Sequence, residues 1–277
     1  CEPTVEFLNK GKVHSILDYS VEGAELDTIF DETCNEIIRT IKRADGDSRI
    51  PLSVFKVTGI GRFALLEKAD AKKTLSDQET LELSRFLNRF EKICQAAYDA
   101  GIPVMVDAEE TWIQDTVDKQ ALSMMRKFNR EKPIVYNTYQ LYRNDKLASL
   151  IAGSAIAKAE GFFFGAKMVR GAYMEKERQR ALDLGYPSPI NDTKEQTDHD
   201  YNAAVAHCAE NVDYIGFVAG THNEQSCQFL VDIIEKNGIE QDNPYVYFSQ
   251  LLGMSDNLSF NLADAGYNVA KYVPYGP

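Results

Sequence analysis

Three basic side chains stand where they could bind an anion or carry covalent chemistry. Lys56 closes the apolar run LSVFKV, and Lys167 and Arg170 lie three residues apart in GAKMVRGAY. A lysine in such a place can anchor an anionic substrate, react as a Schiff-base amine, or simply extend its charge past an apolar rim. Residues three apart on a strand face opposite sides, so one of Lys167 and Arg170 can point inward while the other meets a loop or a phosphate.

Polar side chains close other apolar runs in the same way. They are Asp107 followed by Glu109 and Glu110, Asn137, the triplet Thr221-His222-Asn223, Gln250, and Tyr272. One polar residue at the end of an apolar run is common and implies little. Its repetition along the chain indicates a functional face, because catalytic groups of a (β/α)8 barrel gather at the carboxyl ends of its strands.

The elements that must position these residues follow a regular alternation. Strands are expected at 13–19, 52–57, 104–107, 134–138, 164–170, 214–219, 245–248 and 268–273. Amphipathic helices are expected between them, among others at 24–43, 77–100, 115–130, 146–159 and 224–237. This alternation predicts a parallel sheet wrapped by helices. Eight strands in 277 residues favour an α/β fold of the (β/α)8 type, one barrel domain over residues 1–277, with an open doubly wound sheet as the alternative.

Two connections are long, 59–76 after the second strand and 185–193 after the fifth, and we expect them to cover a ligand. The chain stops at Pro277, where the eighth helix of a barrel would begin. It starts with Cys1 and not with Met, which indicates a piece of a longer protein; a lipidated mature N-terminus is the alternative reading.

Composition removes several classes of function. The net charge is −12, whereas a nucleic-acid-binding protein would show a basic patch or stripe. No apolar run reaches the ~18 residues of a membrane-spanning helix. The five cysteines are odd in number and form no CxxC, which predicts packed, reduced thiols of an intracellular protein. The four histidines form no metal set with them, and the GIG of residues 59–61 lacks the third glycine of a dinucleotide fingerprint.

Taken together, the strand-end motifs resemble those of the proline dehydrogenase family, in particular its mitochondrial-type branch and the bacterial relatives of that branch. The matching segments are SVFKVTG, VMVDAEET, IVYNTYQ, GAKMVRGAY, GYPSPIN, THNEQS, QLLGM and KYVPYGP. They extend from about residue 13 to the end of the chain. The resemblance implies oxidation of L-proline to 1-pyrroline-5-carboxylate by hydride transfer to non-covalent FAD, the first step of proline catabolism.

The resemblance also implies a role for individual residues on the substrate side. Lys56 would hold the proline carboxylate, and Asp107 would orient Lys56. Glu22 would close the site by pairing with an arginine. The proline ring would be walled by Tyr173, Leu252 and Tyr272. The family carries an Arg-Arg pair on the last helix, beyond Pro277, so the chain as given would bind proline weakly until that helix is restored.

On the cofactor side, the resemblance assigns one group of residues to the flavin and another to the rest of FAD. Flavin contacts would come from Asp107, Ala108, Asn137, Lys167, Val169, Gly171, Ala172 and Gln250. The phosphate and adenylate portion would be held by Arg170, Thr221, His222 and Asn223.

The resemblance carries expectations about partners and location as well. A quinone would accept the electrons, and no nucleic acid or metal would be bound. The enzyme would be cytoplasmic in a bacterium, with peripheral association with the inner membrane, or alternatively would reside in the mitochondrial matrix or inner membrane. Other functions stay open on the residues alone: a flavin barrel acting on a modified proline such as hydroxyproline, a Schiff-base aldolase using Lys56 or Lys167, and a non-catalytic binding barrel.

Overall fold

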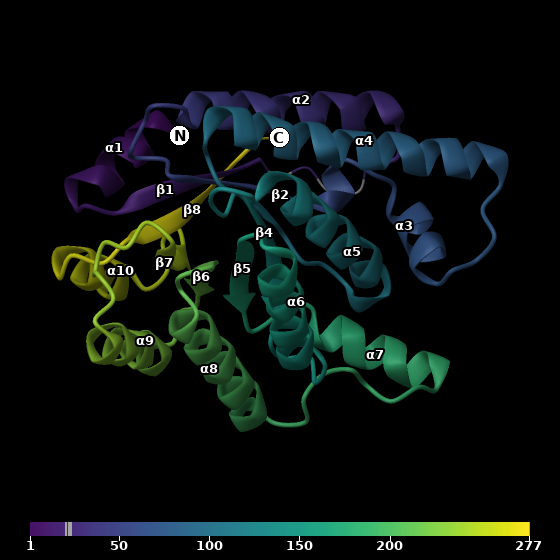
Figure 1. Cartoon of the computed structure of the whole chain (residues 1–277). Helices are drawn as coiled ribbons and strands as arrows, with labels where there is room; N and C mark the ends of the chain where they lie inside the picture. The colour runs from purple at the N-terminus through teal and green to yellow at the C-terminus, as the bar shows by residue number, and fades with distance from the viewer. Residues whose placement is uncertain (20, 22–23, 277) are drawn as a thin grey trace.

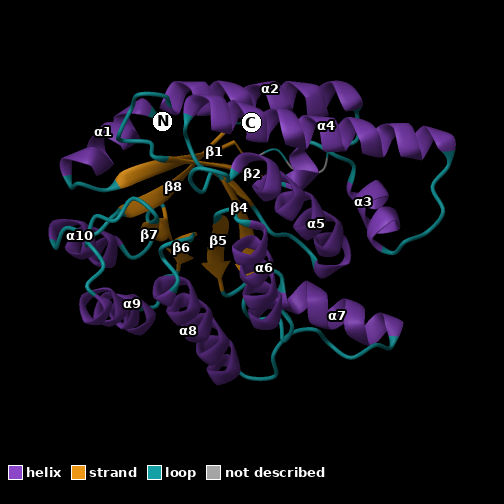
Figure 2. Ribbon diagram, viewed as in Figure 1, coloured by secondary structure: helices purple, strands orange, loops and turns teal. Residues whose placement is uncertain are grey.

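The eight strands close into one parallel barrel in sequence order, from β1 next to β2 round to β8 next to β1. This computed structural model describes residues 1–19, 21 and 24–276, and Figures 1 and 2 show the strands enclosed by helices. The strands are β1 (His14–Tyr19), β2 (Leu52–Phe55), β3 (Val104–Val106), β4 (Val135–Gln140), β5 (Phe164–Val169), β6 (Ile215–Gly220), β7 (Val246–Leu251) and β8 (Val269–Tyr275). The predicted barrel is confirmed, and the open doubly wound sheet is wrong.

Helices cover the outside of the barrel. They are α1 (Glu2–Lys10), α2 (Asp27–Ala44), α3 (Phe63–Asp70), α4 (Asp77–Ala100), α5 (Thr111–Phe128), α6 (Lys146–Glu160), α7 (Met174–Leu184), α8 (Lys194–Glu210), α9 (Glu224–Asn237) and α10 (Asp256–Asp264), with a 3-10 turn η1 (Val57–Gly59). The sequence predicted α4 and α9 at their observed bounds. None of the helices in the described part of the chain is long and apolar enough to cross a membrane.

The strands separate two apolar cores. The inner core fills the barrel with Ile16, Leu52, Val54, Met105, Tyr136, Val218, Ala270 and Tyr272. The larger outer core lies between strands and helices and includes the helical cysteines Cys34, Cys94, Cys208 and Cys227. These four thiols are free and buried, in agreement with a packing role. Successive residues of a strand face opposite sides. A residue of the inner core therefore tells which residues of its strand point into the barrel and which point toward the helices.

Four strands, β4, β6, β7 and β8, extend further than the sequence predicts, and the extensions of β4 and β7 carry predicted or observed site residues. β4 continues to Gln140, which pairs with Val169 of β5, and β7 continues to Leu251, which pairs with Tyr272 of β8. The predicted ends, at 138 and 248, missed these residues because polar side chains interrupt the apolar run. Backbone hydrogen bonds to the neighbouring strands hold these residues in the sheet although the apolar run has ended.

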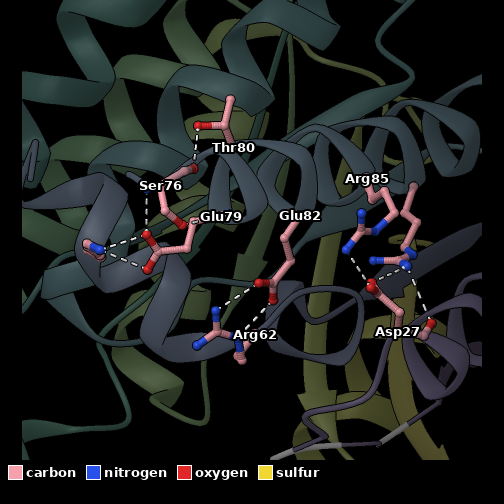
Figure 3. Close-up of polar contacts among 9 residues, drawn as sticks. Asp27, Arg62, Ser76, Glu79, Thr80, Glu82 and Arg85 are labelled. Atoms are coloured by element: carbon pink, nitrogen blue, oxygen red, sulfur yellow. Dashed lines mark hydrogen bonds and ion pairs between the residues drawn. The ribbon is translucent and has the colours of Figure 1, made fainter. Parts of the chain in front are cut away.

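The long connection after β2, residues 59–76, is partly helical, and its role as a cover over a ligand stays a prediction. It contains α3, and ion pairs attach this helix and the residue before it to α4: Lys68 bonds Glu79 at 2.7 Å and Arg62 bonds Glu82 at 2.8 Å. Figure 3 shows the latter pair beside the start of α4. Further along α4, Arg85 bonds Asp27 of α2 at 2.6 Å. The segment 185–193 remains a loop, joined to the loop after β4 by the bridge between Arg143 and Ile190.

The start of α4 provides a stability test. Ser76 accepts a hydrogen bond from the backbone N–H of Glu79, and the Glu79 carboxylate accepts one from the backbone N–H of Ser76. We expect Ser76→Ala to lower the free energy of unfolding by about 1 kcal/mol, because orphan N–H groups at the helix start lose their acceptor. Urea denaturation checks this value. Thr74→Ala, just before the helix, is the control, and an equal loss in both variants would contradict the capping role.

Candidate active site

Two lysines and two aspartates from four strands face one another at the carboxyl end of the barrel. Lys56 follows β2 and lies 3.2 Å from the carboxylate of Asp18 in β1. Lys167 of β5 bonds the carboxylate of Asp107, just past β3, and donates to the hydroxyl of Tyr272 in β8 at 2.7 Å. The Lys167 side chain is only 6% exposed, so its charge depends on these partners. The predicted pairing of Asp107 with Lys56 is therefore wrong: Asp18 takes that place.

Tyr272 is the aromatic centre of this group. The Lys167 ammonium lies 5.0 Å from its ring centroid, and its hydroxyl also approaches the Met105 sulfur at 3.9 Å. Burial, followed by the charges of Asp107 and Asp18, raises the pKa of Tyr272 well above its usual range. The phenol therefore stays neutral and gives the site an apolar wall with one polar tip.

Behind the aspartate, Glu109 ties three strand ends together. Its carboxylate accepts hydrogen bonds from the backbone N–H and the hydroxyl of Thr58, two residues after Lys56. Its backbone carbonyl accepts one from the side chain of Gln140 in β4, at 2.7 Å. Burial raises the pKa of Glu109 to about 7, against the opposing hydrogen bonds from Thr58. Glu109 was noticed in the sequence only as one of the acids after Asp107.

Arg170, just after β5, forms a second set of polar contacts, with α8, the loop after β6 and α9. It bonds Asp198 at 2.7 Å, the Thr221 hydroxyl at 2.7 Å and the Ser226 hydroxyl at 2.9 Å. Its guanidinium also stacks 4.4 Å from the ring centroid of Tyr201. Ser226 lies in the first turn of α9, so Arg170 stands beside the start of a helix, a favourable place for an anion.

The rest of the predicted triplet serves the same region. Asn223 caps α9 by accepting a hydrogen bond from the backbone N–H of Ser226. His222 bonds the Ser255 hydroxyl at 3.1 Å, and burial, helped by the charge of Lys271, lowers its pKa. A neutral imidazole follows from this at neutral pH.

The loop after β5 brings backbone close to the mouth of the barrel. Gly171 has φ of +144°, and a β-carbon there would come within 2.5 Å of the Tyr142 ring, so only glycine fits. Ala172 donates its N–H to the Gln140 side chain at 3.3 Å, and Tyr173 precedes α7, half-buried. Of the remaining predicted flavin contacts, Val169 ends β5 and Ala108 follows Asp107, both half-buried.

Two predicted flavin contacts point away from the barrel interior. Asn137 lies on the same face of β4 as Val135 and Tyr139 of the outer core, and donates to Asp118 of α5 at 2.8 Å. This placement contradicts a role at the barrel mouth. The inward residues near the carboxyl end of β4 are Thr138 and Gln140, and Gln140 lies beyond the predicted strand end at residue 138.

Gln250 is the second correction. It shares the outward face of β7 with Phe248, accepts a hydrogen bond from Ser259 of α10 at 2.9 Å, and donates to the Thr221 carbonyl at 3.0 Å. It therefore supports the loop after β6 from outside. Leu252, in the loop after β7, is 39% exposed and donates its N–H to the Tyr272 carbonyl at 3.1 Å. Glu22 lies outside the described residues.

One missed residue carried a readable signal. Asp18 is two residues after Ile16 of the inner core, so the two-residue period of a strand directs it into the barrel.

The site suits an anionic ligand that also has hydrogen-bonding edges. Lys56, Lys167 and Arg170 supply cations, and the hydroxyl of Thr138 is buried on the inner face without a hydrogen-bond partner among the described residues. A cofactor with a polar ring system and phosphates fits this donor set. No group of three or more His, Cys, Asp or Glu side chains in the described ranges is arranged to hold a metal ion.

Comparison with known proteins agrees with this geometry. A family model described as proline dehydrogenase matches residues 1–277. Human mitochondrial proline dehydrogenase 1 is 40% identical over 234 residues, which is 83% of this chain and 39% of the human protein. The carbapenem antibiotics biosynthesis protein CarD of Pectobacterium carotovorum is 35% identical over 276 residues, covering 100% of this chain and 71% of CarD. The chain thus spans well under half of the human protein's length.

Solved structures agree on the fold. Proline utilization A of Bdellovibrio bacteriovorus superposes with a TM-score of 0.87 at 19% identity, over 100% of this chain and 29% of that one. Proline utilization A of Corynebacterium freiburgense gives 0.82 at 15% identity, over 99% and 27%.

The raised pKa of Glu109 predicts how stability depends on pH. The fold favours the protonated acid, so the stability that this group contributes is full below its ordinary pKa and is lost as pH rises through about 7. Glu109→Gln mimics the protonated form and can keep both bonds to Thr58. Between pH 5 and pH 8, we expect the free energy of unfolding of wild type to fall by about 2 kcal/mol more than that of E109Q. Urea denaturation at both pH values measures this, and parallel losses would contradict it.

Proposed function

The chain belongs to the proline dehydrogenase family, and we propose that it oxidises L-proline to 1-pyrroline-5-carboxylate with bound FAD. The observation that carries the proposal is the convergence of Lys56, Lys167 and Tyr272 at one end of the barrel. These side chains match the three needs of the substrate: a cation for its carboxylate, a positive field at its reacting carbon, and an apolar wall for its ring.

FAD, when bound, accepts the hydride that leaves the ring carbon next to the nitrogen. That carbon gives up its hydride only when the amine is neutral, so the nitrogen lone pair can form the C=N bond. The ammonium of Lys167, fixed between Asp107 and Tyr272, favours the neutral amine and stabilises negative charge that develops beside it. Lys56, at the edge of the mouth with a side chain 16% exposed, is placed to receive the carboxylate.

The cofactor would lie across the mouth from β4 to β6. Gln140 and Thr138 on the inner face of β4 take the role first assigned to Asn137, and Gly171 and Ala172 offer backbone along the same edge. The phosphates would lie near Arg170 and the start of α9. The wall of the proline ring would comprise Tyr272 with Leu252 and Tyr173, and Glu22 stays a proposed gate.

Electron acceptor and location follow from the family with less detail. We propose a quinone as the acceptor. The relatives named as mitochondrial favour a mitochondrial enzyme, whereas the similarity to a Pectobacterium protein keeps a bacterial cytoplasmic one in view. A hydroxylated proline is the alternative substrate. A Schiff-base aldolase is less consistent with the site, because Lys56 and Lys167 each stand in an ion pair with an aspartate while the aldolase reaction needs an uncharged amine.

Substrate oxidation can be followed through the colour of the flavin. We expect L-proline to bleach the chain loaded with FAD under anaerobic conditions. Lys56→Met should raise the proline concentration needed for half-bleaching by roughly 10- to 100-fold, the value of one hydrogen bond to a charged group. Lys68→Met removes a lysine on α3 that pairs with Glu79 of α4, and should leave the titration unchanged. Equal proline affinity in K56M would place the carboxylate elsewhere, and bleaching by hydroxyproline alone would favour the alternative substrate.

The attachment and identity of the flavin can be tested separately. The inward strand-end positions described above carry no cysteine or histidine, so we expect non-covalent FAD. Acid precipitation should release all of the flavin, with the mass of the adenine dinucleotide. Gln140→Ala should weaken FAD retention, whereas Asn137→Ala should lower stability and keep the cofactor. Flavin left on the precipitate, or FMN in its place, would refute the proposal.

A further inference from the structure

Lys271 on β8, next to Tyr272 in the chain, has a role that the mouth of the barrel does not explain. We propose that Lys271 is a positioning residue: it fixes the loop between β7 and α10 and so holds Leu252 at the proline-binding end of the barrel. The inference deepens the proposed function and rests on it for the identity of the substrate.

Lys271 is completely buried, with 0% of its side chain exposed. Its ammonium donates to the carbonyls of Leu251 at 3.3 Å and Met254 at 2.7 Å, and forms an ion pair with Asp256 at the start of α10. Three donors thus meet three acceptors, all within one stretch of six residues. A buried ammonium requires such partners, and here they lie at the last residue of β7, in the loop and at the first residue of α10.

The loop itself is not held by burial. Leu252 and Met254 are 39% and 49% exposed, and Leu251 at the end of β7 is 50% exposed, so these apolar side chains contribute little anchoring. Its backbone is also unusual, because Ser255 has φ of +53°, a left-handed conformation that residues other than glycine seldom adopt. Such a conformation persists when surrounding contacts determine it, and the contacts from Lys271 lie on both sides of it.

The alternation of β8 connects this loop to the substrate. Tyr272 faces the barrel interior, and Lys271 faces the opposite side, beneath the loop. The backbone carbonyl of Tyr272 accepts the N–H of Leu252 at 3.1 Å. Neighbouring residues of one strand therefore set both walls of the proposed proline pocket. Releasing the loop would displace Leu252 and leave Lys56 and Lys167 in place.

The consequence is a loss of substrate binding with little loss of chemistry. An apolar wall contacts the ring equally before and during reaction, so removing it raises KM and leaves kcat nearly unchanged. We expect Lys271→Met to raise KM for L-proline about tenfold with kcat within about twofold. Asp256→Ala should give an intermediate effect, and Lys271→Arg, which keeps a cation with several donors, should recover most of the affinity.

Three further measurements separate positioning from general damage. Methionine has a similar unbranched shape, and the carboxylate of Asp256 is 57% exposed and can be hydrated once the lysine is gone, so K271M should melt within a few degrees of wild type. Lys12→Met removes an exposed lysine that pairs with Asp264 at the other end of α10, and should behave as wild type. In the chain without substrate, hydrogen exchange of the Leu252 and Met254 amides should be faster in K271M than in wild type, and unchanged in K12M.

The outcomes distinguish this inference from the proposed function. If wild type fails to oxidise proline, the proposed function falls, and exchange at Leu252 and Met254 still tests whether Lys271 fixes the loop. Unchanged exchange together with an unchanged KM in K271M would overturn the inference. An equal fall of kcat and kcat/KM would also overturn it, because Lys271 would then act on the reacting groups and not on the wall.

Discussion

A lysine inside a closed barrel is stable only when its charge is matched, and the whole mouth of this barrel is arranged around that requirement. Lys167 reaches across from β5 to the carboxylate of Asp107 after β3 and to the hydroxyl of Tyr272 in β8. No two of these three strands are neighbours in the sheet, so the contacts of Lys167 with Asp107 and Tyr272 form only because the sheet closes. Closure thus creates the site: an open sheet of the same strands would leave these groups far apart.

The outer face of the same strands carries a second layer of polar contacts, and its purpose is different. Asp118 of α5 accepts hydrogen bonds from Asn137 and from Lys146, while Gln250 joins β7 to α10 and to the loop after β6. Asn137 and Gln250 point away from the barrel interior. Asn137 and Lys146 join β4 and α6 to α5, and Gln250 supports the loop that carries Thr221. Polar residues at the strand ends therefore divide into those that face the barrel interior and those that hold the surrounding helices and loops.

The sequence was sufficient for the fold but only in part for the site. Periodicity identified eight strands and placed α4 and α9, because local patterning determines which segments are buried. The errors came from strand length and parity. Ending β4 at residue 138 made Asn137 look like a strand-end ligand, whereas two more paired residues place Gln140 at the mouth instead. The partners of Lys56 and Lys167 could not be predicted, since they depend on which aspartate of another strand the closed sheet brings within reach.

The chain as a whole is acidic, whereas the mouth of the barrel presents cations to a ligand. A net charge of −12 would repel an anionic substrate and a phosphate-bearing cofactor at long range. Aqueous salt screens that repulsion beyond about 10 Å, whereas a cation in the half-buried mouth acts at short range in a less polar medium. Asp18 and Asp107 form ion pairs with Lys56 and Lys167 and so fix the direction of both lysine side chains. The acidic surface therefore serves solubility, and selection of the ligand depends on a few matched cations whose positions the barrel fixes.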